Sequence, residues 1–171
     1  MERSSPTIAP VIADGLPFLW KLLSDAAQDA GLSPLSPEAA YDAPFGKYLV
    51  GWGHPGDAGV VAHLVGGDLV GAAWYRLFPP EQPGYGFVAP DVPELSIRLL
   101  APYRGQGIGG SLLSALIQCA RQEGYSALSL SVNRTNPALR LYVRHGFVDA
   151  GLSEPSDRSV TMVNDFSRVA P

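Results

Sequence analysis

A glycine-rich stretch in the second half of the chain, YRGQGIGGSLL at 103–113, has the composition of a loop that holds phosphate. It lies between an apolar run and a long amphipathic run, so we expect it to lead from a strand into a helix. The free amides of a first helical turn and the helix dipole together favour an anion. Glycines let a bulky phosphate approach those amides without a Cβ in the way. The stretch therefore predicts an anion-binding loop.

The spacing of these glycines fits two different phosphate sites. The dinucleotide fingerprint G-x-G-x-x-G is matched by Gly105, Gly107 and Gly110. The pattern R-x-x-G-x-G of an acyl-CoA site is matched by Arg104, Gly107 and Gly109. A dinucleotide fold places its glycines after the first strand and an acid about 20 residues later. Here about half the chain comes first and residues 131–133 (SVN) occupy the place of the acid, so NAD(P) binding is the less favoured alternative.

The distribution of charge supports a polyanionic small ligand at this loop. The chain has a net charge of -4, which argues against general nucleic-acid binding. Half of its Lys and Arg residues nevertheless lie between Arg98 and Arg144, a window whose single acid is Glu123. A locally basic half around a glycine loop is best explained by a ligand that carries phosphate.

Two stretches together resemble the GCN5-related N-acetyltransferase (GNAT) superfamily. The first, LSIRLLAPYRGQGIGGSLLSALIQCARQEGY, is similar to the acetyl-CoA motif of that family. The second, LSLSVNRTNPALRLYVRHGF, is similar to its next strand and helix, where N-P-A-x-x-L-Y-x-x-x-G-F recurs. The resemblance is strong from Glu94 to Phe147 and weaker over the N-terminal part. Two independent motifs at the right separation are more specific than either alone.

The resemblance implies acetyl-CoA as the cosubstrate, no metal, and a set of contacts. The strand backbone that would hold the pantetheine arm and the acetyl carbonyl belongs to Ile97, Arg98 and Leu99. The amides that would cradle the pyrophosphate belong to Gly105, Gln106, Gly107, Ile108, Gly109 and Gly110. Arg104 opens this motif. Asn136 matches the asparagine that bonds the CoA arm, although its place before Pro137 is also that of a helix N-cap.

The implied chemistry is direct acetyl transfer to a primary amine in a ternary complex. Such a transfer needs a neutral amine, an oxyanion stabilised by a backbone N–H, and a proton for the departing thiolate. Tyr142 matches the tyrosine beside the CoA sulfur and is the expected general acid, because tyrosine stays neutral at pH 7. Leu99 would supply the N–H. The alternative from another class is a non-catalytic acyl-CoA-binding or regulatory module on the same scaffold.

The general base is the least defined part of the site. The branch of the family that acts on ribosomal-protein N-termini carries an acid in an L-x-L-E-V pattern, and here Ser131 in LSLSV takes its place. Glu94, at the start of the central strand, is the expected base, and Asp91 and Glu81 in the preceding loop are the next candidates. Deprotonation relayed by water, without one essential base, is the alternative.

The acceptor is expected to be a small-molecule or peptide amine on the other side of the central strand. It would lie near the N-terminal helices and the Pro-rich and Gly-rich loop at 79–93, where the candidate lining residues are Trp74, Tyr85 and Phe87. The sequence contains no conspicuous acidic cluster that would indicate a polyamine as the acceptor. The sequence names neither the amine nor the exact acyl group. An exposed sheet edge would be compatible with a homodimer.

A mixed sheet with helices on it must position these residues. Strands are predicted near 7–15, 59–65, 69–78, 94–100, 127–132, 147–151 and 158–166. Helices are predicted at 15–31, 108–124 and 136–147, with one short helix within 32–59. This order predicts a mixed sheet with helices on it. The resemblance implies an α/β (α+β) fold of GNAT type, with a mixed, mostly antiparallel central sheet of roughly six to seven strands, about four flanking helices and a splay at the central strand.

The length of 171 residues predicts one domain at 6–171 after a flexible tail at 1–5. The hydrophobic fraction of 46% and charged fraction of 16% are those of a globular chain. No apolar run approaches the ~18 residues of a membrane span, and the start MERSSPTIAP lacks a signal pattern. A cytoplasmic protein without a membrane partner is therefore expected, and the lone Cys119 is expected to serve packing.

Overall fold

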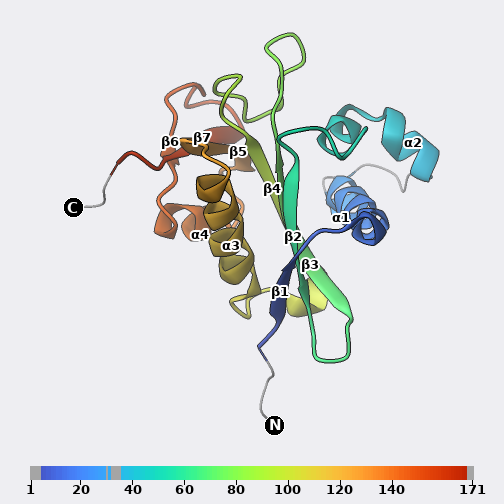
Figure 1. Cartoon of the computed structure of the whole chain (residues 1–171). Coiled ribbons are helices and arrows are strands. Elements are labelled where there is room, and N and C mark those ends of the chain that lie inside the picture. Colours follow the sequence, from blue (N-terminus) through green and yellow to red (C-terminus); the bar gives the residue numbers. More distant parts are fainter. Residues whose placement is uncertain (1–4, 30, 32–35, 169–171) are drawn as a thin grey trace.

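The computed structural model describes residues 5–29, 31 and 36–168, so the expected tail at 1–5 lies outside the described residues except for Ser5. A seven-stranded sheet in the order β1-β2-β3-β4-β5-β7-β6 forms the centre (Figure 1). Its neighbouring strands are antiparallel except for β4 and β5, which are parallel. The mixed, mostly antiparallel sheet predicted from the sequence is therefore confirmed.

The first half of the chain forms an antiparallel meander with helices on one face. Its strands are β1 (Thr7–Pro10), β2 (Ala58–His63), β3 (Leu69–Arg76) and β4 (Glu94–Leu99). Its helical elements are the 3-10 turns η1 (Ala13–Gly15) and η2 (Pro44–Tyr48) and the helices α1 (Leu16–Asp29) and α2 (Pro37–Asp42). β2 and β3 form the predicted hairpin, whose turn needs Gly66 and Gly67 because both have positive φ.

The second half of the chain supplies the remaining helices and strands. Its elements are η3 (Ala101–Tyr103), α3 (Ile108–Gln122), β5 (Ala127–Asn133), α4 (Leu139–Arg144), β6 (Val148–Asp149) and β7 (Ser159–Asp165). α4 begins later than the sequence predicted, because a separate turn precedes it. In that turn Asn136 Oδ1 accepts a hydrogen bond from Ala138 N at 2.9 Å, so Asn136 caps the turn and not the helix itself.

The sheet separates two apolar cores. α3 and α4 lie on one side of it and α1 and α2 on the other (Figure 1). The α3 core contains Leu112 and Leu116 from the predicted helical stripe. The α1 core contains Leu19 and Leu22 from α1 and Trp74 from β3. The alternation of β3 and β4 therefore sends successive side chains to different chemical environments.

β4 and β5 touch at one end and then diverge. They share a single ladder pair, Glu94 with Ser129, next to a hydrogen bond of 2.9 Å from Ser129 N to Pro93 O. β4 otherwise pairs with β3, and β5 pairs with β7 along its whole length. The splay predicted at the central strand is thus confirmed, and it leaves an opening in the middle of the sheet.

A buried ion pair fixes η2 beside this opening. Arg76 on β3 donates to the two carboxylate oxygens of Asp57 at 2.9 and 2.8 Å. Its Nη1 also donates to Lys47 O at 2.9 Å. A charge pair this deeply buried holds one geometry only when such hydrogen bonds satisfy it. Because Lys47 precedes Tyr48, this contact holds the backbone next to Tyr48 in place.

Candidate active site

A cleft of about 770 Å³ occupies the opening between β4 and β5. Its lining comes from both sides of the sheet. Val132 and Tyr142 belong to the core under α3 and α4, whereas Leu22, Tyr48 and Trp74 belong to the core under α1. The cleft therefore connects the two faces of the molecule through the sheet.

The glycine loop leads from β4 into α3 with its amides free. Gly105 and Gly107 have φ of 71° and 85°, and Gly107 is the N-cap of α3. Within the described part of the chain, the amides of Gly105 to Gly110 donate to no backbone carbonyl and no side chain. Free amides and the dipole at the start of α3 are the features that favour an anion at this loop.

Alternate residues of β4 turn their backbone groups into the opening. Leu100 N donates to Val70 O at 2.9 Å, so by antiparallel alternation the N–H and C=O of Arg98 face β3. The N–H and C=O groups of Ile97 and Leu99 point the opposite way, across the opening toward β5. Of the three strand residues expected to bind the cosubstrate through their backbone, two are therefore suitably turned, and Arg98 lines the cleft with its side chain.

Glu94 is buried at the closed end of the splay, where it is 3% exposed. Its Oε1 accepts hydrogen bonds from Tyr48 OH at 2.6 Å and from Gly86 N at 2.9 Å. Its Oε2 has no partner among the described residues and lies against Gly84, where a Cβ would collide with it. Burial raises the pKa of Glu94, and the hydrogen bond from Tyr48 opposes that rise. A carboxyl with a raised pKa beside a cleft is suited to act as a general base.

Tyr48 connects this carboxyl to the cleft. Its hydroxyl donates to Glu94 and accepts from Tyr85 N at 2.8 Å, and its ring lines the cleft. Burial, followed by the charge of Glu94, raises the pKa of Tyr48, so this hydroxyl keeps its proton. Tyr48 was not predicted from the sequence, because it lies in a 3-10 turn 46 residues before Glu94 and belongs to no motif.

Tyr142 lies on α4 at the α3 side of the cleft and is 7% exposed. Its ring meets Phe147 edge to face, with centroids 6.0 Å apart. Burial raises the pKa of Tyr142 to about 12, and the nearby charge of Arg98 opposes this. The hydroxyl is therefore protonated throughout the neutral range and can donate a proton. Asn136 also lines the cleft, with its Oδ1 already engaged in the turn before α4.

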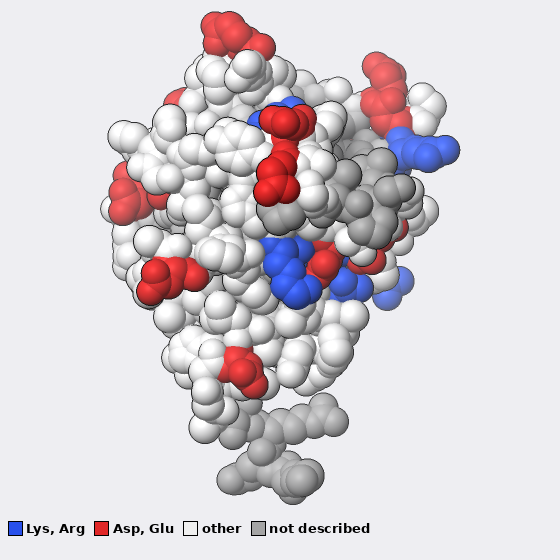
Figure 2. Space-filling view, turned by 90° about the vertical axis from the view of Figure 1, so that its right-hand side faces the viewer, with Lys and Arg blue, Asp and Glu red and all other residues white. Residues whose placement is uncertain are grey.

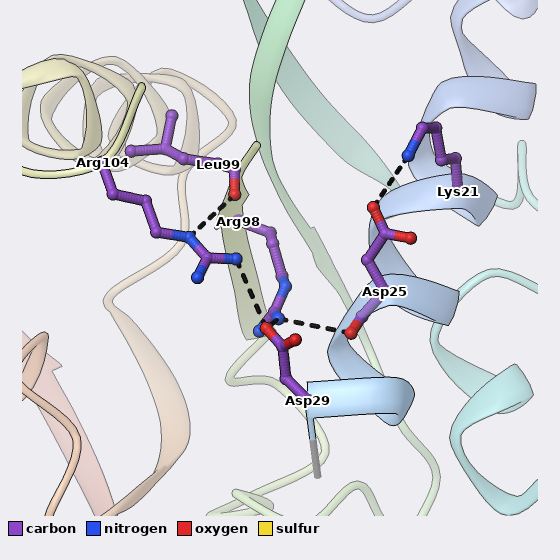
Figure 3. Close-up of polar contacts among 6 residues, drawn as sticks. All are labelled: Lys21, Asp25, Asp29, Arg98, Leu99 and Arg104. Atoms are coloured by element: carbon purple, nitrogen blue, oxygen red, sulfur yellow. Dashed lines mark hydrogen bonds and ion pairs between the residues drawn. The ribbon is translucent and has the colours of Figure 1, made fainter. Parts of the chain in front are cut away.

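Charged side chains join the end of α1 to the end of β4 (Figure 3). Arg98 forms an ion pair with Asp29 and also donates to Asp25 O at 3.4 Å. Arg104 Nη2 lies 3.4 Å from the same Asp29 carboxylate, and its Nε donates to Leu99 O at 3.2 Å. Both arginines were predicted at the cosubstrate site, whereas no sequence signal pointed to Asp29.

The structure also locates the other candidates for base and acceptor contacts. Glu81 and Asp91 are exposed, and neither is among the residues that line the described cleft. Ser131 lines it, at the position where the ribosomal-protein branch would carry an acid. Trp74 and Tyr85 also line it. Phe87, the third aromatic candidate, packs against the core under α1 instead.

Two properties of the described residues concern metal ions and membranes. No group of three or more His, Cys, Asp or Glu side chains in residues 5–29, 31 and 36–168 is placed to hold a metal ion. No helix in those residues has both the length and the apolar character needed to cross a membrane. The expectation that no metal takes part stays a prediction.

Comparisons with known proteins identify acetyltransferases. The model of the acetyltransferase (GNAT) family matches residues 18–147. The ribosomal-protein-alanine N-acetyltransferase of Brucella melitensis is 25% identical with a TM-score of 0.69, covering 93% of this chain and 99% of that one. A GNAT superfamily phosphinothricin acetyltransferase of Sinorhizobium meliloti, solved in complex with AcCoA, is 22% identical with a TM-score of 0.68, covering 94% and 88%. A GCN5-related N-acetyltransferase of Kribbella flavida is 23% identical with a TM-score of 0.68, covering 94% and 98%. None of the curated proteins compared with the chain matches it.

Proposed function

Because the chain belongs to the acetyltransferase (GNAT) family, we propose that it moves an acetyl group from acetyl-CoA to a primary amine by direct transfer in a ternary complex. The observation that supports this most is the cleft through the splayed sheet. It runs from Asn136 and Tyr142 on one side to the buried carboxyl of Glu94 on the other, and β4, which lines it, leads into the loop of free amides. A relative of the same fold was solved with AcCoA.

The cosubstrate binds from the α3 face. Its pyrophosphate takes hydrogen bonds from the amides of Gly105 to Gly110, with Arg104 beside them. Its pantetheine arm pairs with the outward backbone groups of Ile97 and Leu99 like an added strand. Asn136, which lines the same side, contacts the arm. This arrangement puts the thioester in the opening next to Tyr142.

Proton transfers accompany the reaction on both sides of the thioester. The Tyr48 hydroxyl passes its proton to Glu94 as it takes one from the ammonium group of the acceptor, so Tyr48 stays protonated and the neutral amine attacks the thioester carbon. The N–H of Leu99, which faces the opening, stabilises the oxyanion. As the C–S bond breaks, Tyr142 gives its proton to the sulfur and takes the proton that the new amide nitrogen releases. Glu94 returns its proton to solvent, so the products are the N-acetyl amine, the CoA thiol and a proton.

The acceptor half of the cleft, on the α1 face, has two unlike walls. The aromatic wall consists of Leu22, Leu23, Phe45, Tyr48, Trp74 and Tyr85. The hydroxyl wall, from β5, β7 and the segment before β7, consists of Ser131, Ser153, Ser159 and Thr161. The carboxyl groups in the lining are those of Glu94, the proposed base, and Asp157, whose Oδ2 already accepts a hydrogen bond from Glu154 N at 2.9 Å. This lining suits an amine with one cationic centre and an apolar or aromatic body, because each further cation would need its own partner.

Calorimetry with CoA, followed by thiol release with a panel of amines, tests the proposal. We expect CoA to bind, and kcat/KM to be at least roughly 10-fold higher with phenethylamine than with spermidine, since the aromatic wall buries the phenyl ring. The assay is run over the background of acetyl-CoA hydrolysis without amine, which is the control.

The possible negative results of this experiment contradict different parts of the proposal. An absence of CoA binding at millimolar ligand would overturn the proposal as a whole. CoA binding without thiol release for any amine would favour a non-catalytic acyl-CoA-binding module. A preference for spermidine would leave the transfer reaction standing and contradict the assignment of the acceptor.

A further inference from the structure

Asp29, the last residue of α1, forms ion pairs with two arginines, Arg98 and Arg104 (Figure 3). Arg98 comes from β4, and Arg104 stands immediately before the run of free amides that begins at Gly105. The Asp29 carboxylate is therefore an anion of the protein itself, bound beside a site built for the anion of a ligand.

The position of Asp29 depends on these arginines. A carboxylate at the C-terminal end of a helix lies at the unfavourable end of the helix dipole. The face that carries α1 and α2 is mostly uncharged, and near its middle basic and acidic side chains lie side by side (Figure 2). The ion pairs with Arg98 and Arg104, together with the hydrogen bond from Arg98 to Asp25 O, thus tie the end of α1 to the end of β4.

The two ion pairs differ in how readily they can be exchanged. The Arg104 and Asp29 side chains are 48% and 56% exposed and lie 3.4 Å apart, which makes a weak, salt-screened contact. The Arg98 side chain is 24% exposed and is also anchored on Asp25 O. A phosphate offers more charge and more acceptor oxygens than a carboxylate, so it can take Arg104 but not Arg98 from Asp29.

We propose that Asp29 is a positioning residue that gives up Arg104 to a phosphate of the cosubstrate, so that cosubstrate binding loosens the end of α1. This inference rests on the proposed function, because it needs acetyl-CoA at the glycine loop. Leu22, Leu23 and Ala26 of α1 line the acceptor half of the cleft. These residues precede Asp29 on the same helix, so the acceptor half is the part of the cleft that loosening the end of α1 reaches.

The first measurement is the Kd of CoA for Asp29→Asn and for the matched variant Asp25→Asn. Asp25 lies one turn earlier on α1, where its carboxylate pairs with Lys21 at 2.9 Å. Removing the competing carboxylate frees Arg104, so Asp29→Asn is expected to bind CoA at least about threefold more tightly than the wild type, the scale of one exposed ion pair. Asp25→Asn is expected to stay within about twofold of the wild type.

The second measurement separates exchange of Arg104 from simple repulsion of phosphate by Asp29. The Kd of CoA is compared between Arg104→Gln and the double variant Asp29→Asn/Arg104→Gln. If Asp29 acts by holding Arg104, the tightening disappears in the Arg104→Gln background. An equal tightening with and without Arg104 would overturn the inference.

The third measurement follows α1 itself and needs no acceptor. Amide hydrogen exchange of the last turn of α1 is expected to speed up when CoA saturates the wild type, and to be fast already in Asp29→Asn without ligand. Slower exchange on CoA binding, or no tightening by Asp29→Asn over Asp25→Asn, would overturn the inference while leaving acetyl transfer intact. A wild type that binds no CoA would overturn both proposals.

Discussion

Replacing Tyr142 by phenylalanine is expected to lower kcat by roughly 100-fold or more, the usual contribution of a general acid, while the Kd of CoA changes by less than about twofold. The ring stays in its place against Phe147, and only the buried hydroxyl with its pKa raised to about 12 is lost. Without it the thiolate must leave unprotonated. Steady-state kinetics with a working acceptor, combined with calorimetry for CoA, measure both quantities.

Tyr75→Phe is the matched control for this change. Tyr75 is fully buried in the same core, its hydroxyl has no hydrogen-bond partner among the described residues, and it does not line the described cleft. Removing that hydroxyl should leave kcat within about twofold of the wild type. A kcat that is unchanged in Tyr142→Phe, or equally reduced in both variants, would remove Tyr142 from the mechanism.

Replacing Glu94 by glutamine is expected to lower kcat/KM by about 100-fold at neutral pH, since the acceptor loses its base. The glutamine oxygen can still accept from Tyr48 and Gly86, so the fold around the cleft persists. Glu81→Gln and Asp91→Asn, which change exposed carboxylates outside the cleft lining, are the controls and should leave kcat/KM unchanged. A loss in either control comparable to that in Glu94→Gln would point to another base.

The raised pKa of Glu94 also predicts a pH dependence in the wild type that Glu94→Gln should lack. Glu94 is a base only when ionised, so the wild-type rate should fall as the pH drops through a pKa above that of an ordinary glutamate. Between the ordinary and the raised pKa the folded state binds more protons than the unfolded one. The stability due to Glu94 is therefore lost as pH rises through the folded pKa. Melting temperatures measured across pH should show this decline in the wild type and not in Glu94→Gln.

Features encoded by neighbouring residues could be predicted from the sequence. The glycines at 105, 107, 109 and 110 follow an alternating strand and precede a helical stripe, so loop and helix were placed together. Tyr142 was predicted because the motif from Asn136 onward is contiguous. The start of α4 was harder to predict, because the Asn136 side chain can cap either a helix or a separate turn. Here it caps the turn, and α4 begins only at Leu139.

The acceptor half of the site could be predicted only in part, because its parts are distant in the chain: Trp74 and Tyr85 were candidates, whereas Tyr48 was not. The buried Glu94 carboxyl takes hydrogen bonds from Tyr48 and Gly86, and Gly84 leaves room for its Oε2. Gly86 itself is pressed against the backbone of β5, where a Cβ would collide with Leu130. No spacing rule connects these positions, so the sequence could nominate Glu94 but could not show that it is buried.

The single ladder pair between β4 and β5 also has a consequence for how the chain folds. On one side of it, β1 to β4 lie in the sheet in the order in which they occur in the chain, and on the other side lie β5, β6 and β7. Each half can therefore assemble from contacts within its own stretch, at a small entropic cost of loop closure. α3 stands between the halves in sequence and packs against β2 and β3 of one half and β5 of the other. Its docking makes the two halves one cooperative unit, so a sheet that is open through its middle still folds as a whole.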